Sequence, residues 1–124
     1  MDYRRIRTQA VILRGNHVLM VRPPGGQWAL PGGDAEEGEI PEDALLRTVS
    51  VETGAEIKIL KHLTREKNVH ETYRLVLTFL AELQSQAYDP STYSGPLEVD
   101  WRSMRAPELK ESIYEKHLAG KERQ

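Results

Sequence analysis

The sequence predicts an α/β (α+β) fold in which a mixed β-sheet is sandwiched between helices. Aliphatic and β-branched runs follow one another as strands, a helix, strands and a second helix. The segment 41–54 starts and stops with residues typical of helix ends. The chain has 124 residues, 39% of them hydrophobic and 29% charged, which suits one hydrophobic core and is too short for two. We therefore expect a single domain over residues 1–124.

The first part of the sheet is predicted to be a hairpin. Residues 8–13 and 17–21 are aliphatic and β-branched, and Arg14-Gly15-Asn16 between them is a turn signal. Residues 23–26, Pro-Pro-Gly-Gly, should end the second strand because proline cannot donate to a ladder. Residues 28–30 can form at most a short buried strand, which the Pro31-Gly32-Gly33 bend would end.

The helix that follows is predicted over residues 41–53. Pro41 suits the first helical turn, where its missing N–H would have no partner. Glu42 and Asp43 favour the positive end of the helix dipole, and Gly54 suits the C-terminal cap. The residues expected to face the core are Ala44, Leu45 and Val49.

The remaining elements are two long strands, a short strand and a last helix. Residues 57–63 and 73–83 are the predicted long strands, joined by a charged connection at 65–71. Residues 84–96 form a polar loop. The final elements expected are a strand at 98–104 and a helix that Pro107 opens and Gly120 ends.

Composition excludes several classes of partner. The net charge is -2 and the pI about 6.1, so no global basic field favours polymeric nucleic acid or an anionic membrane. No apolar run approaches the ~20 residues that span a bilayer. The chain has no cysteine, which excludes thiolate chemistry and is compatible with a reducing compartment. We expect a cytoplasmic protein with no membrane partner.

The most unusual segment is an acidic loop that leads into the helix. Residues 34–43 contain six acids and no basic residue. Gly33 is followed after five residues by Glu39, and after seven more by Arg47-Thr48-Val49-Ser50-Val51-Glu52-Thr53-Gly54-Ala55. In isolation such an acidic run is usually a solvated helix start. Its spacing to the glycine before it and to the Arg, Glu and Gly after it is what points to function.

This spacing closely resembles the Nudix box, which reads Gly, five residues, Glu, seven residues, then Arg-Glu-aliphatic-any-Glu-Glu-any-Gly-aliphatic. The positions that match in register are Gly33, Glu39, Arg47, Val49, Glu52 and Gly54. The lead-in at 28–33 and the late Trp101 are also typical of the family. The resemblance implies a Nudix fold and a hydrolase that cleaves a nucleoside-diphosphate-linked compound, a small molecule, with Mg²⁺ or Mn²⁺. It also raises the expectation of a homodimer, because dimers are common in the family.

The resemblance assigns roles residue by residue. It implies catalytic roles for Glu52, Arg47 and Glu39, and metal binding by Glu52, Glu39 and Glu36. Gly32 and Gly33 would shape the phosphate site. Apart from the resemblance, the position of Arg22 just before the Pro-Pro-Gly-Gly loop suggests a further phosphate contact. The chemistry agrees, since a diphosphate is highly charged and hard cations with oxygen ligands neutralise it and activate water.

The sequence departs from the box at two of its glutamate positions, which Thr48 and Val51 occupy. At an effective dielectric near 20, each carboxylate lost ~4 Å from a cation forfeits roughly 4 kcal/mol before desolvation. Metal affinity should therefore fall sharply. The acids available as substitutes are Glu36, Glu37, Glu39, Glu98 and Asp100. Two hypotheses follow: an attenuated hydrolase, or a catalytically silent Nudix-fold module that binds a nucleotide or a protein.

Several residues with a proposed functional role also suit a purely structural role. Glu39 and Arg47 suit a structural ion pair between loop and helix as well as they suit catalysis. Trp28 and Trp101 are typical of core or lid residues as well as of base-stacking platforms. A lone arginine such as Arg22 is commonly a surface residue.

Overall fold

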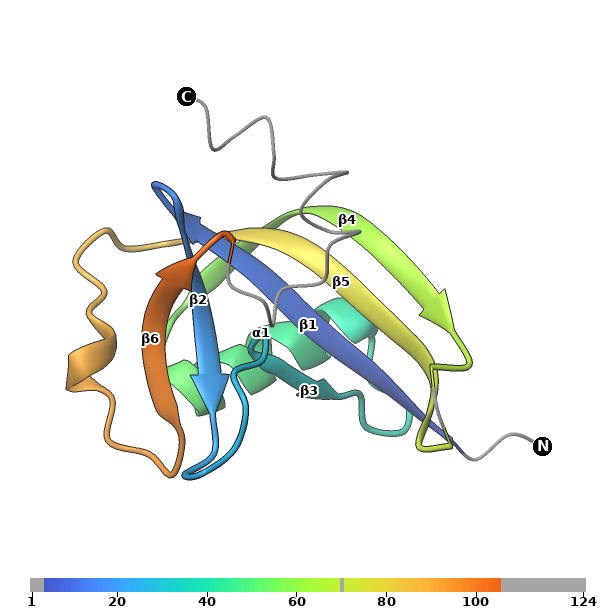
Figure 1. Ribbon diagram of the computed structural model, residues 1–124. Helices are drawn as coiled ribbons and strands as arrows, with labels where there is room; N and C mark the ends of the chain where they lie inside the picture. The colour runs from blue at the N-terminus through green and yellow to red at the C-terminus, as the bar shows by residue number, and fades with distance from the viewer. Residues whose placement is uncertain (1–3, 70, 106–124) are drawn as a thin grey trace.

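The computed structural model describes residues 4–69 and 71–105, which form a mixed sheet with one helix against it (Figure 1). The elements are β1 (Arg5–Arg14), β2 (His17–Arg22), β3 (Gly32–Asp34), α1 (Pro41–Thr53), β4 (Ile57–Lys67), β5 (Tyr73–Leu83), the short 3₁₀ helix η1 (Pro90–Thr92) and β6 (Glu98–Ser103). The expected C-terminal helix at 107–120 lies outside the described residues. No helix in the described part is long and apolar enough to cross a membrane.

The sheet is mixed, as predicted, because β1 pairs with neighbours in both directions. Its strand order is β4-β5-β1-β2-β6, and β3 pairs with β1 away from this path. β1 runs parallel to β5, from Arg5↔Tyr73 to Ile12↔Ala81, and antiparallel to β2 and β3. β3 and β2 therefore share one side of β1, with β3 beside its first half and β2 beside its last residues.

The helix α1 has the predicted bounds and buries the predicted stripe. Gly54 adopts the left-handed conformation at φ 75°, and its N–H donates to the Ser50 carbonyl at 2.8 Å. Ala44, Leu45 and Val49 are fully buried. Leu45 and Val49 pack against the sheet in one core cluster, whose sheet members include Ala10, Ile12, Leu77 and Phe79. This packing fixes which side of α1 faces the bend at Gly32.

Two strand predictions were wrong in extent. β4 continues to Lys67, so residues 65–67 are strand and not the predicted connection. The reason is the antiparallel ladder with β5, in which Lys67 pairs with Leu75 and which tolerates charged side chains on an edge strand. Gly32–Asp34, expected to be a bend, pairs with β1. Residues 28–30 form one bridge, Ala29 to Val21, which agrees with the expectation of a short strand at most.

Candidate active site

The site is built where β3 passes between β1 and α1. Gly32 pairs with Gln9 of β1, and its backbone N–H donates to Glu52 Oε1 at 2.8 Å. Gly32 has φ 152°, and a Cβ there would meet the Thr8 carbonyl oxygen and lie 2.6 Å from Gln9 Cα. Only glycine fits this crossing. The bend therefore holds the Glu52 carboxylate at a defined place on the helix face.

Glu52 is half-buried and has one polar oxygen free of hydrogen bonds. Burial raises the pKa of its carboxyl, while the Gly32 N–H and the Arg7 guanidinium act to lower it. Arg7 is itself fixed by donating to the Leu30 carbonyl at 3.1 Å. Within the described residues, Oε2 of Glu52 has no hydrogen-bond donor. A partly desolvated carboxylate with an available oxygen is suited to bind a cation that accompanies an anionic ligand.

Arg47 and Glu39 clamp the acidic loop to the helix. Arg47 Nε donates to Glu39 Oε2 at 2.9 Å and Nη2 donates to Oε1 at 2.8 Å, a bidentate pair. Arg47 also donates to the Asp34 carbonyl at 3.1 Å, and the Glu36 N–H donates to Glu39 at 3.0 Å. The hydrogen bonds from Arg47 and from the Glu36 N–H lower the pKa of Glu39 to about 2, and the Arg47 bond is the larger cause. Both oxygens of Glu39 are thus already used by the framework.

The clamp makes a pH-dependent contribution to stability. Since the pKa of Glu39 falls from 4.5 to about 2 on folding, its stabilisation is present above pH 4.5 and is lost as the pH falls towards 2. We expect Glu39→Gln to lower the melting temperature at pH 7 by several degrees, and the gap to the parent to close between pH 4.5 and 2. Glu42→Gln, an exposed first-turn acid, is the matched control and should shift the melting temperature little at any pH. Equal shifts for both variants would contradict the clamp.

Thr48 and Val51, at the two substituted box positions, offer no carboxylate, and they differ in burial. The Thr48 hydroxyl donates to the Ala44 carbonyl at 2.8 Å, and its methyl group abuts Gly33. Val51 is 70% exposed. Thr48 therefore fills the space beside the bend with carbon and a satisfied hydroxyl, whereas Val51 leaves its position open to solvent.

The suggested substitute acids do not complete a metal centre. Among the described residues, no group of three or more His, Cys, Asp or Glu side chains is placed to hold a metal ion. Glu36 and Glu37 are exposed on the loop, Glu98 pairs with Arg22, and Asp100 accepts from the Trp101 N–H at 2.8 Å. The residues therefore do not fit a preformed multi-carboxylate site.

Arg22, the predicted phosphate contact, is held by partners outside the bend. It ends β2, pairs with Glu98 of the neighbouring β6, and stacks on Trp28 with 4.6 Å to the ring centroid. Within the described residues, no hydrogen bond or ion pair joins its side chain to Gly32 or Glu52. Sequence reasoning instead missed Arg7, whose charge acts on Glu52. Its position on β1 beside β3 follows from strand pairing, which no local motif signals.

Comparison with known proteins defines the class. The family model of the NUDIX domain matches residues 4–120. The chain therefore belongs to the NUDIX domain family. An 8-oxo-dGTP diphosphatase of Proteus vulgaris is 34% identical over 64 residues, which are 46% of this chain and 57% of that protein. A putative 8-oxo-dGTP diphosphatase of Bacillus subtilis (strain 168) is 41% identical over 61 residues, 41% of this chain and 39% of that protein. The match thus spans about half, or less, of these relatives.

Solved structures support the fold. The crystal structure of a UDP-X diphosphatase superposes with a TM-score of 0.73 at 21% identity, covering 100% of this chain and 63% of the other. An ADP-ribose pyrophosphatase from Streptococcus suis superposes with a TM-score of 0.68 at 20% identity, covering 96% and 87% of the two chains. At such identities the likeness establishes the Nudix fold alone.

Proposed function

We propose that this chain is an attenuated Nudix-type hydrolase of nucleoside-diphosphate-linked compounds, taken up as their Mg²⁺ or Mn²⁺ complexes. The observation that supports it is the Glu52 carboxylate, held by the Gly32 N–H at 2.8 Å in the register of the Nudix box. The Arg47–Glu39 clamp fixes the loop around it. Family membership adds weight, since Nudix hydrolases generally use divalent metals.

The cation is proposed to arrive as part of the substrate because the protein alone does not supply its ligands. Mg²⁺ commonly binds through one or two carboxylates together with substrate phosphates and water. Glu52 is the carboxylate with an available oxygen, whereas Glu39 is committed to Arg47 and Glu36 is exposed. With one carboxylate in place of three, charge neutralisation at the diphosphate is weaker. The proposed rate is correspondingly low.

The substrate panel follows from the relatives. The Proteus vulgaris relative is named an 8-oxo-dGTP diphosphatase and the Bacillus subtilis relative a putative one. The panel therefore includes 8-oxo-dGTP and dGTP beside sugar nucleotides and ADP-ribose. The assay measures release of monophosphate, phosphate or pyrophosphate with Mg²⁺ and with Mn²⁺. Metal-dependent product formation on any of these compounds supports the proposal.

Glu52→Gln tests the proposal by replacing one carboxylate oxygen with an amide nitrogen. Glutamine keeps the acceptor for the Gly32 N–H but removes the charge that burial disfavours. The pKa of Glu52 is raised on folding, so its contribution favours folding at low pH and is lost as the pH rises through the folded pKa. The variant should therefore melt at the parent's temperature or above it at pH 7, yet hydrolyse about tenfold more slowly.

A matched control separates this effect from general loss of charge. Glu42→Gln removes an exposed acid of the same helix and should leave hydrolysis unchanged. Rates that are the same for the parent and Glu52→Gln would remove Glu52 from the site.

The second candidate is a silent Nudix-fold module that binds a nucleotide or a protein. Thr48 and Val51 favour it, because neither provides a carboxylate and no acid group completes a metal site among the described residues. This candidate predicts nucleotide or protein binding with no product on the panel at any divalent cation concentration. Detectable metal-dependent turnover that Glu52→Gln lowers would exclude it.

A further inference from the structure

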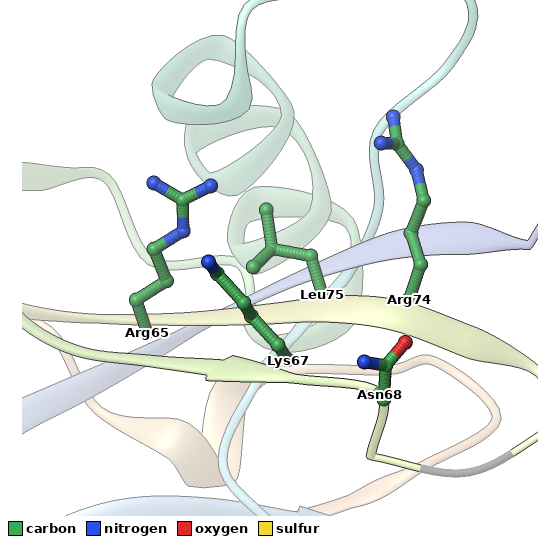
Figure 2. A pocket seen from close by; sticks show the side chains of 5 residues that line it. All are labelled: Arg65, Lys67, Asn68, Arg74 and Leu75. Carbon is green, nitrogen blue, oxygen red and sulfur yellow. The ribbon is translucent and has the colours of Figure 1, made fainter. Parts of the chain in front are cut away.

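A basic pocket opens between β4 and β5, on residues that the candidate active site does not use. Its volume is about 200 Å³, and its lining residues are Arg65, Lys67, Asn68, Arg74 and Leu75. The side chains of Arg65, Lys67 and Arg74 rise from the two strands on the same side, around Leu75 (Figure 2). Three cations thus line a small cavity, and none of its described lining residues is acidic.

Strand pairing places two of these cations, Arg65 and Lys67, on the side of the sheet that carries the core leucines Leu75 and Leu77. Arg65 pairs with Leu77 and Lys67 with Leu75 across the β4–β5 ladder. Leu77 belongs to the core cluster that includes Leu45 of α1, and Leu75 packs against it. Because alternate residues of a strand face opposite sides, Glu66 between the two cations points to the other face.

No salt bridge among the described residues neutralises this charge. Within residues 4–69 and 71–105, the side chains of Arg65, Lys67 and Arg74 form no ion pair. The neighbouring acidic loop lines an adjoining pocket that also includes Arg74, and two of the loop's acids have other partners. Glu39 is bound to Arg47 at 2.8 Å and Asp34 to Arg5 at 2.9 Å. Like charges held around one cavity repel, so a bound anion would relieve a cost that the empty pocket carries.

The hydrogen-bond donors that line the pocket and the pocket's volume indicate which ligand fits it. Two guanidinium groups and an ammonium match the oxygens of phosphate groups. Asn68 is fixed at the rim by accepting from Arg4 Nη2 at 2.7 Å, which leaves its amide nitrogen to donate. A cavity of about 200 Å³ is below the ~300–1,000 Å³ usual for drug-sized ligands. It suits a phosphate or diphosphate group without an attached base.

We propose that this pocket is a second anion site that binds phosphate or diphosphate groups without a metal, separately from Glu52. The source is either free inorganic phosphate and pyrophosphate or the terminal phosphates of a nucleotide. The proposal does not depend on hydrolysis by this chain. It would stand if the protein proved to be a silent module.

Calorimetric titration of the full chain in EDTA, with inorganic pyrophosphate as the probe, tests the site. We expect binding in the millimolar range or tighter. Arg65→Gln combined with Lys67→Gln should weaken it at least about tenfold. Lys58→Gln combined with Lys61→Gln removes the same charge from exposed positions of the same strand and should leave binding unchanged. Arg74→Gln gives an independent second variant should the first double variant fail to fold.

Further measurements separate this site from the proposed active site and from a structural role. Glu52→Gln should bind pyrophosphate like the parent. Without anion, the Arg65/Lys67 variant should melt at or above the parent's temperature, because repulsion is relieved. ADP binding as strong as that of pyrophosphate, with none by adenosine, would identify nucleotide phosphates as the source, and pyrophosphate binding alone would identify the free anion. No pyrophosphate binding by the parent, equal loss in the Lys58/Lys61 control, or loss in Glu52→Gln would overturn the proposal.

Discussion

Gly32→Ala should cost about 3 kcal/mol or more of unfolding free energy and lower the melting temperature by about 10 °C. The added Cβ would meet the Thr8 carbonyl oxygen and lie 2.6 Å from Gln9 Cα. Both are backbone atoms of β1, the strand that pairs with β5, β2 and β3, so neither can move without disturbing the sheet. Urea unfolding and thermal melts measure the loss.

A second glycine isolates the cause. Gly25 also has a positive φ of 76°, but an added Cβ there meets no atom within 4 Å. Gly25→Ala should therefore lower the unfolding free energy only by the cost of a left-handed backbone at alanine, about 1–2 kcal/mol. Equal destabilisation by the two variants would show that the close approach of β3 to β1 is not what requires Gly32. The same approach brings the Gly32 N–H to Glu52, so Gly32→Ala variants that still fold should also lose hydrolysis.

Features with local causes were predicted well from the sequence. The helix at 41–53 is confirmed because Pro41 and Gly54 act within one turn of their own positions. The Nudix box groups Gly33, Arg47 and Glu52 in one motif, and in the structure Glu52 accepts from the Gly32 N–H while Arg47 donates to the Asp34 carbonyl. The sheet was predicted as mixed, yet its parallel β1–β5 ladder joins residues about 68 positions apart, such as Arg5 and Tyr73, and no local signal specifies that pairing.

Features that depend on distant pairing were missed or misplaced. Arg22 was predicted to contact phosphate, which stays a prediction. Its ion pair with Glu98, which the β2–β6 ladder brings opposite it, was not expected from the sequence. β4 was predicted to end at residue 63 because its later residues are charged, whereas the ladder with β5 carries it to Lys67. The basic pocket at Arg65, Lys67 and Arg74 exists only because of that extension. The charged residues after 63 suggested a loop, whereas pairing with β5 makes them part of β4 and of the pocket lining.

Thr48→Glu combined with Val51→Glu should raise metal-dependent diphosphate hydrolysis on the order of ten- to a hundredfold. With Glu52, these substitutions restore three carboxylates at i, i+3 and i+4 of α1, where they lie on neighbouring positions of one helix face. Val51 is 70% exposed and accepts a glutamate at little cost. Thr48 is buried against Gly33, so its glutamate must extend past the bend towards Glu52 and loses the bond to the Ala44 carbonyl.

Stability without and with metal tests the same cluster independently of turnover. In EDTA the double variant should melt below the parent, since three carboxylates repel and one is partly buried. Mg²⁺ or Mn²⁺ should then raise its melting temperature more than the parent's, because a ligand stabilises the folded state that binds it. Thr48→Gln combined with Val51→Gln is the matched control: it has the same shape without the charge and should gain neither metal stabilisation nor activity. The glutamate variant contradicts the proposal if it folds, yet responds to metal no more than the glutamine control and gains no turnover on the substrate panel. The helix face is then not a weakened diphosphatase site, and the silent binding module becomes the better account of this chain.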